Sequence, residues 1–158
     1  MSSRPAIGLW LLAATLTLFA STGCRSLPPI PPANLTAPGW SVRNGQAVWK
    51  PNQQRPELAG ELLVATNTNG DCVVEFTKTP FALASARRLG DCWRIEFGTG
   101  RHAWQGRGPG PRQVSWFELP HVLAGEPAGR AWRFTQTNGT WRLENWRSGE
   151  RLEGTFAP

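Results

Sequence analysis

The chain has 158 residues, a formal net charge of +6 and 40% hydrophobic residues. This length fits one domain, and the hydrophobic content is enough for a packed core, which excludes a wholly disordered chain. No solenoid-length repeat and no collagen-like glycine period is present. Aromatic usage is uneven, with nine Trp, seven Phe and no Tyr. The sequence therefore predicts a small globular domain with an aromatic-rich core.

Residues 1–23 are typical of a bacterial lipoprotein signal peptide. Arg4 gives a positive start, and the apolar stretch 6–20 is short for a membrane span, which takes about 20 residues. Small residues then lead to Cys24, as in the lipobox, where a cysteine is acylated and becomes the mature N-terminus. Ser21 departs from the Leu that this pattern prefers. An ordinary signal peptide with an incidental cysteine is the alternative, but we expect lipid attachment at Cys24.

The residues after Cys24 predict where the domain is held. Arg25 replaces the acidic residue that retains many Gram-negative lipoproteins in the inner membrane, so we expect the periplasmic face of the outer membrane. Residues 24–38 contain five prolines, which predicts a semi-rigid extended tether before a single β-rich domain at 39–158. The positive charge fits either a solvated arginine-rich surface or attraction to anionic lipid, and no nucleic-acid partner is expected outside the cytoplasm.

From residue 40 onward, short apolar segments alternate with turn residues. The predicted strands are 42–50, 59–66, 71–78, 81–88, 91–97 and 102–105. Strands at short, regular spacing with turns between them predict an antiparallel meander. Residues 112–124 break this pattern with apolar side chains at helical spacing, and Pro120 is expected to split them into two short helices.

The C-terminal part predicts two hairpins. Asn138-Gly139 suits the positive φ of a tight type I′ turn between 131–137 and 140–146, which pairs Phe134 with Leu143. A second turn at Ser148-Gly149 then pairs Trp141 with Phe156. Both turns together place the large apolar side chains on one face of three strands, namely Trp132, Phe134, Trp141, Leu143, Leu152 and Phe156.

The middle strands predict a sheet that is apolar on both faces. Tight turns at Thr79-Pro80 and Leu89-Gly90 set their register. One face then holds Ala82, Ala84, Ala86, Trp93, Ile95, Phe97 and Val73. The other holds Cys72, Val74, Phe76 and Leu83. A sheet with one wet face should not show this pattern, so either a helix covers the second face or that face lines an apolar cavity.

Cys72 and Cys92 are candidates for a disulfide, because an exported protein meets an oxidising compartment. The predicted register argues against it, since it places them on either side of one strand, with Cα atoms about 10 Å apart against a limit of about 7 Å. Both outcomes stay open. His102 and His121 lack the spacing of metal ligands, so neither a metal nor another cofactor is expected.

No residue pattern predicts catalysis. Ser115, Glu118 and His121 are close in sequence, but a catalytic triad is defined by geometry and not by proximity. Glu144 and Glu150 have arginine neighbours, which favours surface ion pairs over a carboxylate pair. We therefore expect a protein that is not an enzyme.

Two segments resemble the outer-membrane lipoprotein-localisation family, the receptor LolB and its periplasmic partner LolA. Residues 73–89, VVEFTKTPFALASARRL, are similar to the family's strand–loop–strand, with Phe81 in the loop 79–82 at the place of a protruding Leu. Residues 111–125, PRQVSWFELPHVLAG, are similar to its short helical segment between strands. The resemblance covers about residues 40–158, with a mature chain shorter than the family pattern.

The resemblance implies a mainly β fold, a curved antiparallel half-barrel with one short helical region packed on its concave face. It implies that acyl chains of lipoproteins pass from a LolA-like carrier into an apolar cavity and then into the membrane. Phe81 would be the prong that meets the membrane, and the cavity would be lined by Trp93, Ile95, Phe97, Trp104 and Trp116. The alternative is a non-catalytic structural or interaction lipoprotein of the cell envelope with a solid core.

Overall fold

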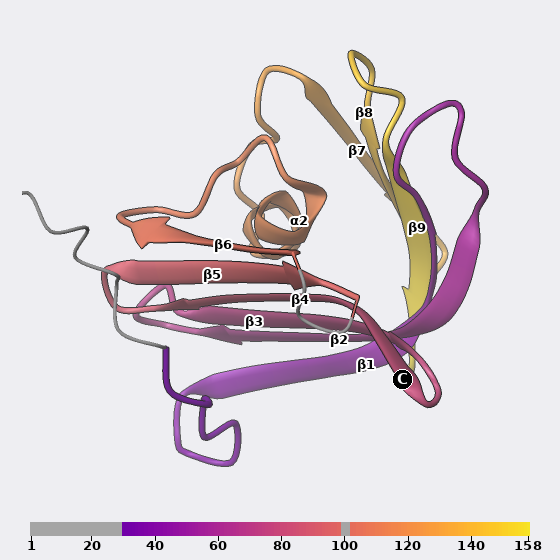
Figure 1. The fold of residues 1–158 in the computed structure, drawn as a ribbon. Coiled ribbons are helices and arrows are strands. Elements are labelled where there is room, and N and C mark those ends of the chain that lie inside the picture. Colours follow the sequence, from indigo (N-terminus) through magenta and orange to yellow (C-terminus); the bar gives the residue numbers. More distant parts are fainter. Residues whose placement is uncertain (1–29, 99–101) are drawn as a thin grey trace, which may run out of the picture.

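The computed structural model describes residues 30–98 and 102–158, which form one antiparallel sheet and one helix (Figure 1). The elements are β1 (Trp40–Lys50), β2 (Leu58–Asn67), β3 (Cys72–Lys78), β4 (Phe81–Leu89), β5 (Cys92–Phe97), β6 (His102–Arg107), α2 (Ser115–Leu123), β7 (Trp132–Thr137), β8 (Thr140–Asn145) and β9 (Arg151–Phe156). The predicted signal peptide and Cys24 lie outside the described residues. Within those residues, no helix combines the length and the apolar character that crossing a bilayer requires.

The sheet joins two meanders through its first strand. Its order is β6-β5-β4-β3-β2-β1-β9-β8-β7, so β1 pairs with β2 on one side and with β9 on the other. The predicted antiparallel arrangement with one helical region is confirmed. β6 and β7 are the two edges, so the sheet is not closed, and it is not strongly curled (Figure 1).

The C-terminal hairpins confirm the predicted apolar face but correct one register. Asn138 and Gly139 have φ values of 51° and 80°, and Phe134 lies opposite Leu143 as expected. Trp141, however, lies opposite Gly154 and not opposite Phe156. The second loop is longer than the predicted turn, since β8 ends at Asn145 and β9 starts at Arg151. A shift of two residues keeps every side chain on its face, and the Trp141 and Phe156 rings still stack, with centroids 5.5 Å apart.

In the middle strands the predicted register is wrong by one residue. A β-bulge between Phe76 and Thr77 sets Phe76 opposite Ala84, whereas the tight turn alone would set it opposite Leu83. Because side chains alternate along a strand, this one-residue shift moves residues 72–76 of β3 to the other face relative to β4. One core cluster therefore contains side chains that the sequence assigned to opposite faces: Cys72, Val74, Phe76, Ala84, Ala86 and Ile95.

The same correction removes the second apolar face over β4 and β5. The face away from the core carries polar side chains, including Ser85. These side chains form two ion pairs, Arg87–Glu75 at 3.1 Å and Arg94–Glu96. The sheet is thus apolar toward the helix and largely polar on the other side here, as an antiparallel sheet covered on one face should be.

Helix α2 packs on the apolar face as one helix. Pro120 lies inside it, so the predicted split into two helices is wrong. Proline removes the bond that its N–H would donate to the Trp116 carbonyl. The Ala124 N–H nevertheless donates to the Pro120 carbonyl at 3.1 Å, and Pro120 itself is buried, so packing carries the helix past the proline.

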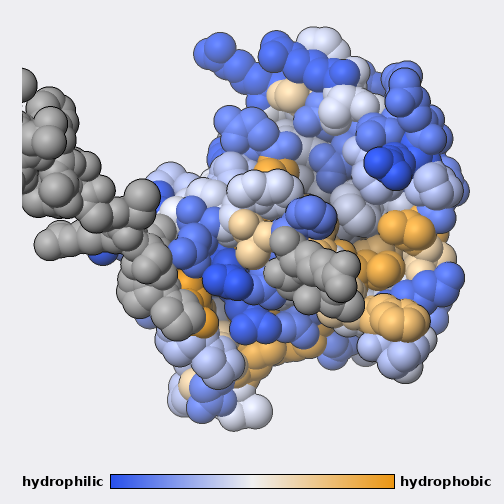
Figure 2. All heavy atoms as spheres, viewed as in Figure 1, coloured by the Kyte–Doolittle hydropathy of each residue, from blue (hydrophilic) through white to orange (hydrophobic). Residues whose placement is uncertain are grey.

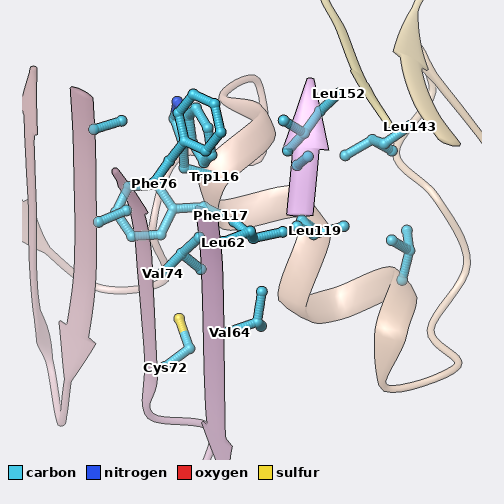
Figure 3. Packing of buried hydrophobic residues seen from close by; sticks show 14 of the residues in the cluster. Leu62, Val64, Cys72, Val74, Phe76, Trp116, Phe117, Leu119, Leu143 and Leu152 are labelled. Carbon is cyan, nitrogen blue, oxygen red and sulfur yellow. The ribbon is translucent and has the colours of Figure 1, made fainter. Parts of the chain in front are cut away.

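Aromatic rings fill the space between α2 and the sheet. Trp116 stacks on Phe76 with ring centroids 5.4 Å apart and meets the edge of Trp49 at 5.1 Å. Figure 3 shows Trp116 beside Phe76, with Leu119 of the helix facing the side of the core that holds Leu143 and Leu152. One continuous core therefore links the helix to both meanders.

The register predicts opposite costs for two neighbouring residues of β3. Phe76→Ala should lower the free energy of unfolding by about 3–5 kcal/mol, because it leaves a cavity under Trp116. Glu75→Ala removes only a half-exposed ion pair and should cost less than about 1 kcal/mol. Urea denaturation of both variants measures the difference, and a larger loss for Glu75→Ala would contradict the bulged register.

Candidate functional site

The tip of the β3–β4 hairpin presents an exposed aromatic side chain. The Thr79–Pro80 peptide bond is cis, and the side chain of Phe81 that follows is 62% exposed. Ala82 beside it is also exposed. On the face seen in Figure 2, apolar side chains gather toward the lower right, the side on which this hairpin ends in Figure 1, amid a mainly hydrophilic surface. The structure thus places Phe81 where a membrane or an apolar partner can reach it.

The five predicted cavity residues differ widely in burial. Ile95 and Trp116 are 2% and 1% exposed and belong to the packed core. Trp93 and Phe97 are half-buried against that core, and Trp104 is 57% exposed on the edge strand β6. The structure therefore distributes these side chains from the core to the surface.

Aromatic contacts connect the same side chains into a chain of rings. Trp104 contacts Phe97 and Phe97 stacks on Trp49, each with centroids 5.7 Å apart, and Trp49 contacts Trp116. Trp93 meets the edge of Phe117 of the helix, also at 5.7 Å. Such contacts contribute about 0.5–1.5 kcal/mol each beyond simple burial. They fill the helix-covered face with side chains where the resemblance implies a cavity.

A groove of about 520 Å³ lies on the opposite face of the sheet, beside the tip of the β3–β4 hairpin, where Thr77, Lys78 and Thr79 line it. One row of paired residues crosses it from β8 to β3, namely Thr140, Thr155, Gln46, Glu61 and Thr77. These side chains carry hydroxyl, amide and carboxyl groups, which would be left without water beneath an acyl chain. The lining also includes Val48 and Ala59, so the groove offers a mixed polar and apolar surface.

The two cysteines of the domain are free thiols. Cys72 on β3 and Cys92 on β5 lie on either side of β4. The predicted register gave the same arrangement, which argued against a disulfide. Burial raises the pKa of the Cys72 thiol to about 11. That thiol stays protonated and unreactive near neutral pH.

The serine, glutamate and histidine of α2 form three separate interactions and no catalytic triad. His121 Nδ1 lies 3.0 Å from Glu126 Oε2. The fully buried Glu118 carboxylate accepts two hydrogen bonds from the Arg112 guanidinium, at 2.8 and 3.1 Å, and one from the Gly129 N–H at 2.6 Å. These bonds fasten the helix to the segments before and after it.

Ser115 instead meets Glu150, which corrects the prediction for that carboxyl. Ser115 Oγ donates to Glu150 Oε1 at 2.6 Å, and Trp49 Nε1 donates to the same oxygen at 3.1 Å. Burial raises the pKa of Glu150, and these two hydrogen bonds partly oppose the shift. Glu144, by contrast, pairs with Arg142 at 3.3 Å on the surface as predicted. The sequence carries no signal for the Glu150 contacts, because its partners come from β1 and α2.

Glu150 should make stability depend on pH. Because its folded-state pKa lies above the ordinary value of 4.5, the folded protein holds this proton more tightly than the unfolded chain. The stability that the protonated Glu150 contributes is fully present below pH 4.5. It is lost as pH rises through the raised pKa of Glu150. In Glu150→Gln the amide oxygen can still accept both hydrogen bonds, so this loss should disappear.

Urea denaturation of Glu150→Gln and of the parent between pH 4 and 8 measures the effect. The difference in unfolding free energy should move in favour of the variant as pH rises. Glu144→Gln, a surface ion-pair change, is the control and should shift stability by less than about 1 kcal/mol. A parent that gains stability relative to Glu150→Gln with rising pH would contradict the buried carboxyl.

Comparison of the chain with protein-family models finds no matching family, and comparison with curated proteins finds no match. The resemblance to the lipoprotein-localisation family therefore stays a prediction.

Proposed function

We propose that the protein is a non-catalytic lipoprotein of the bacterial cell envelope, held by an acylated Cys24 at the periplasmic face of the outer membrane. In this proposal the β3–β4 hairpin tip contacts the membrane surface. The observation that carries the proposal is the 62% exposure of Phe81 at that tip. Together with the exposed Ala82 beside it, this side chain forms an apolar hairpin end, and moving that apolar surface from water into a bilayer is favourable.

Burial of Phe81 in the bilayer is too weak to hold the domain there without the lipid anchor. Burying one Phe side chain contributes about 1.5–3 kcal/mol, which gives only weak membrane binding by itself. An acyl anchor keeps the domain beside the bilayer, so that a weak second contact becomes an intramolecular one. Phe81 would then orient the anchored domain and would not recruit it.

The described end of the tether supports this arrangement. Ile30 lies beside Arg87 and Arg94, on the polar face of β4 and β5. The short stretch between Cys24 and Ile30 spans at most about 20 Å when fully extended. The domain therefore stays within one molecular diameter of its proposed anchor, and Phe81 begins β4, the strand whose Ser85 and Arg87 line one small pocket with Ile30.

A second candidate function is the one that the resemblance implies, acceptance of lipoprotein acyl chains from a LolA-like carrier under the helix. It requires a more open, half-barrel-like arrangement in which α2 moves away from the sheet. One observation favours it: Trp116 and Trp141 bury their indole N–H groups without a hydrogen-bond partner. A buried donor without a partner costs about 1–3 kcal/mol, which would lower the free energy needed to lift the helix.

Membrane contact is tested with the acylated chain in phospholipid vesicles. A polarity-sensitive dye attached at Phe81→Cys should show a blue-shifted emission when vesicles are present, and the same dye at Val42→Cys, an exposed position on β1, should not. A Cys92→Ser background removes the half-buried native thiol. Equal emission at both positions would contradict the contact at the hairpin tip.

Phe81→Glu should leave the melting temperature within about 3 °C of the parent, because an exposed side chain contributes little to stability. The charge should also remove the contact of the hairpin with the bilayer, seen as renewed quenching of a dye at position 82 by an aqueous quencher. Val42→Glu is the matched control. A drop of about 10 °C or more in Phe81→Glu would show that the side chain packs in the fold.

The second candidate is tested by titrating the chain with a fluorescent fatty-acyl probe. Saturable binding that Ile95→Asn abolishes, while Arg133→Asn does not, would favour an acyl site under the helix. Absence of saturable binding would leave the membrane-contacting module as the proposal. Melting curves of both variants separate loss of binding from loss of fold.

A further inference from the structure

A second concave site lies at the opposite end of the C-terminal meander from the Asn-Gly turn. This cleft has a volume of about 590 Å³, within the range of small-molecule sites. It opens between the loop before α2, the start of β7 and the β8–β9 loop. We call it the Glu150 cleft, and its lining residues that matter here are Arg112, Arg130, Trp132, Asn145, Arg147 and Glu150.

The inner wall of the Glu150 cleft is fixed by hydrogen bonds. Trp132 Nε1 donates to the Arg112 carbonyl at 2.7 Å. The buried Asn145 accepts the backbone N–H groups of Arg147 and Ser148 on Oδ1, at 3.0 and 3.2 Å. The loop that carries Arg147 therefore has a defined shape, which a preformed site requires.

Two of the three arginines at the cleft have no carboxylate partner among the described residues. Arg112 is bound to Glu118, but no ion pair involves Arg130 or Arg147. Trp146 connects these two: its Nε1 donates to the Arg130 carbonyl at 3.3 Å, and the Arg147 guanidinium lies 5.0 Å from its ring centroid. The exposed ring of Trp146 thus holds both arginine segments at one rim of the cleft.

Guanidinium groups bind carboxylate and phosphate oxygens in pairs of parallel hydrogen bonds. We infer that the Glu150 cleft binds the carboxylate or phosphate group of a ligand between Arg130 and Arg147. The oxyanion belongs either to a free small molecule or to a phospholipid headgroup. This site is separate from the hairpin tip and does not depend on the contact proposed for Phe81.

Among the described residues, Glu150 is the only acidic one that lines this cleft, and its hydrogen bonds and burial set it apart from an exposed carboxylate. Its Oε1 is taken by Ser115 and Trp49, and burial raises its pKa. The other charged side chains in the lining are Arg112, Arg130 and Arg147. Arg112 is already paired with Glu118. For a ligand whose own charge stays constant, oxyanion binding should therefore weaken as pH rises through the raised pKa of Glu150.

The experiment compares the parent chain with an Arg130→Gln/Arg147→Gln double variant in two arms. One arm titrates inorganic phosphate by calorimetry, and the other measures flotation of the chain without its acyl group with phosphatidylglycerol or phosphatidylcholine vesicles, so that the anchor cannot hold it on either. Loss of charge-assisted hydrogen bonds should weaken binding about tenfold or more. Arg133→Gln, an exposed arginine of β7 outside the cleft lining, should leave it unchanged.

Each outcome decides the inference. Phosphate binding that only the double variant loses supports a free small molecule as ligand. Selective flotation with phosphatidylglycerol that the double variant loses, without phosphate binding, supports a headgroup; Phe81 is present in both chains, so its contribution cancels. Arg147→Lys, which keeps the charge but not the planar fork, should also weaken binding. Absence of binding in both arms, or binding that survives in the double variant, overturns the inference.

Discussion

The packing of Trp116 between Phe76 and Trp49 is the contact on which the rest of the structure depends. Phe76 comes from β3 and Trp49 from the end of β1, which is the strand that joins the two meanders. A nine-residue helix with an internal proline has little stability of its own. Its buried aromatic face supplies what its backbone lacks, and it covers the apolar face that the sheet would otherwise expose.

A buried carboxyl, Glu118, and a half-buried one, Glu150, complete the attachment of this helix, one from each side. Glu118 points from the helix to Arg112 and Gly129, and Glu150 reaches from the β8–β9 loop to Ser115. A buried charge must be paired or hydrogen-bonded, so these contacts fix the loops on either side of α2 as firmly as the core fixes the helix. The Glu150 cleft is a consequence, since its walls are the segments that these carboxyls hold.

Much of the fold follows from local sequence signals, and the errors follow from features that are not local. The register of the β7–β8 hairpin could be predicted, because two residues, Asn138 and Gly139, determine the geometry of its turn. The longer loop before β9 shifted one register by two residues and left the apolar face intact. The bulge beside Phe76 shifted another register by only one residue, and this reversed the face of residues 72–76 of β3 relative to β4.

The candidate site shows the same division. An exposed Phe81 was predictable, because a turn signal lies directly before it. The filled state of the helix-covered face was not, since it depends on rings from β1, β3, β5 and α2 that meet only in the folded chain. The partners of Glu150 are equally distant in sequence, so its arginine neighbours along the chain misled the prediction.

Hydrogen exchange of the α2 backbone amides, compared with those of β2 and β3, measures whether the helix opens separately from the sheet. If the helix is an integral part of a filled core, its amides should open only with global unfolding and should exchange as slowly as those of the two strands. Exchange in α2 that is faster than in β2 and β3 by about a hundredfold or more would mean that the helix lifts alone. That result would contradict a solid core and would favour a cavity that opens beneath it.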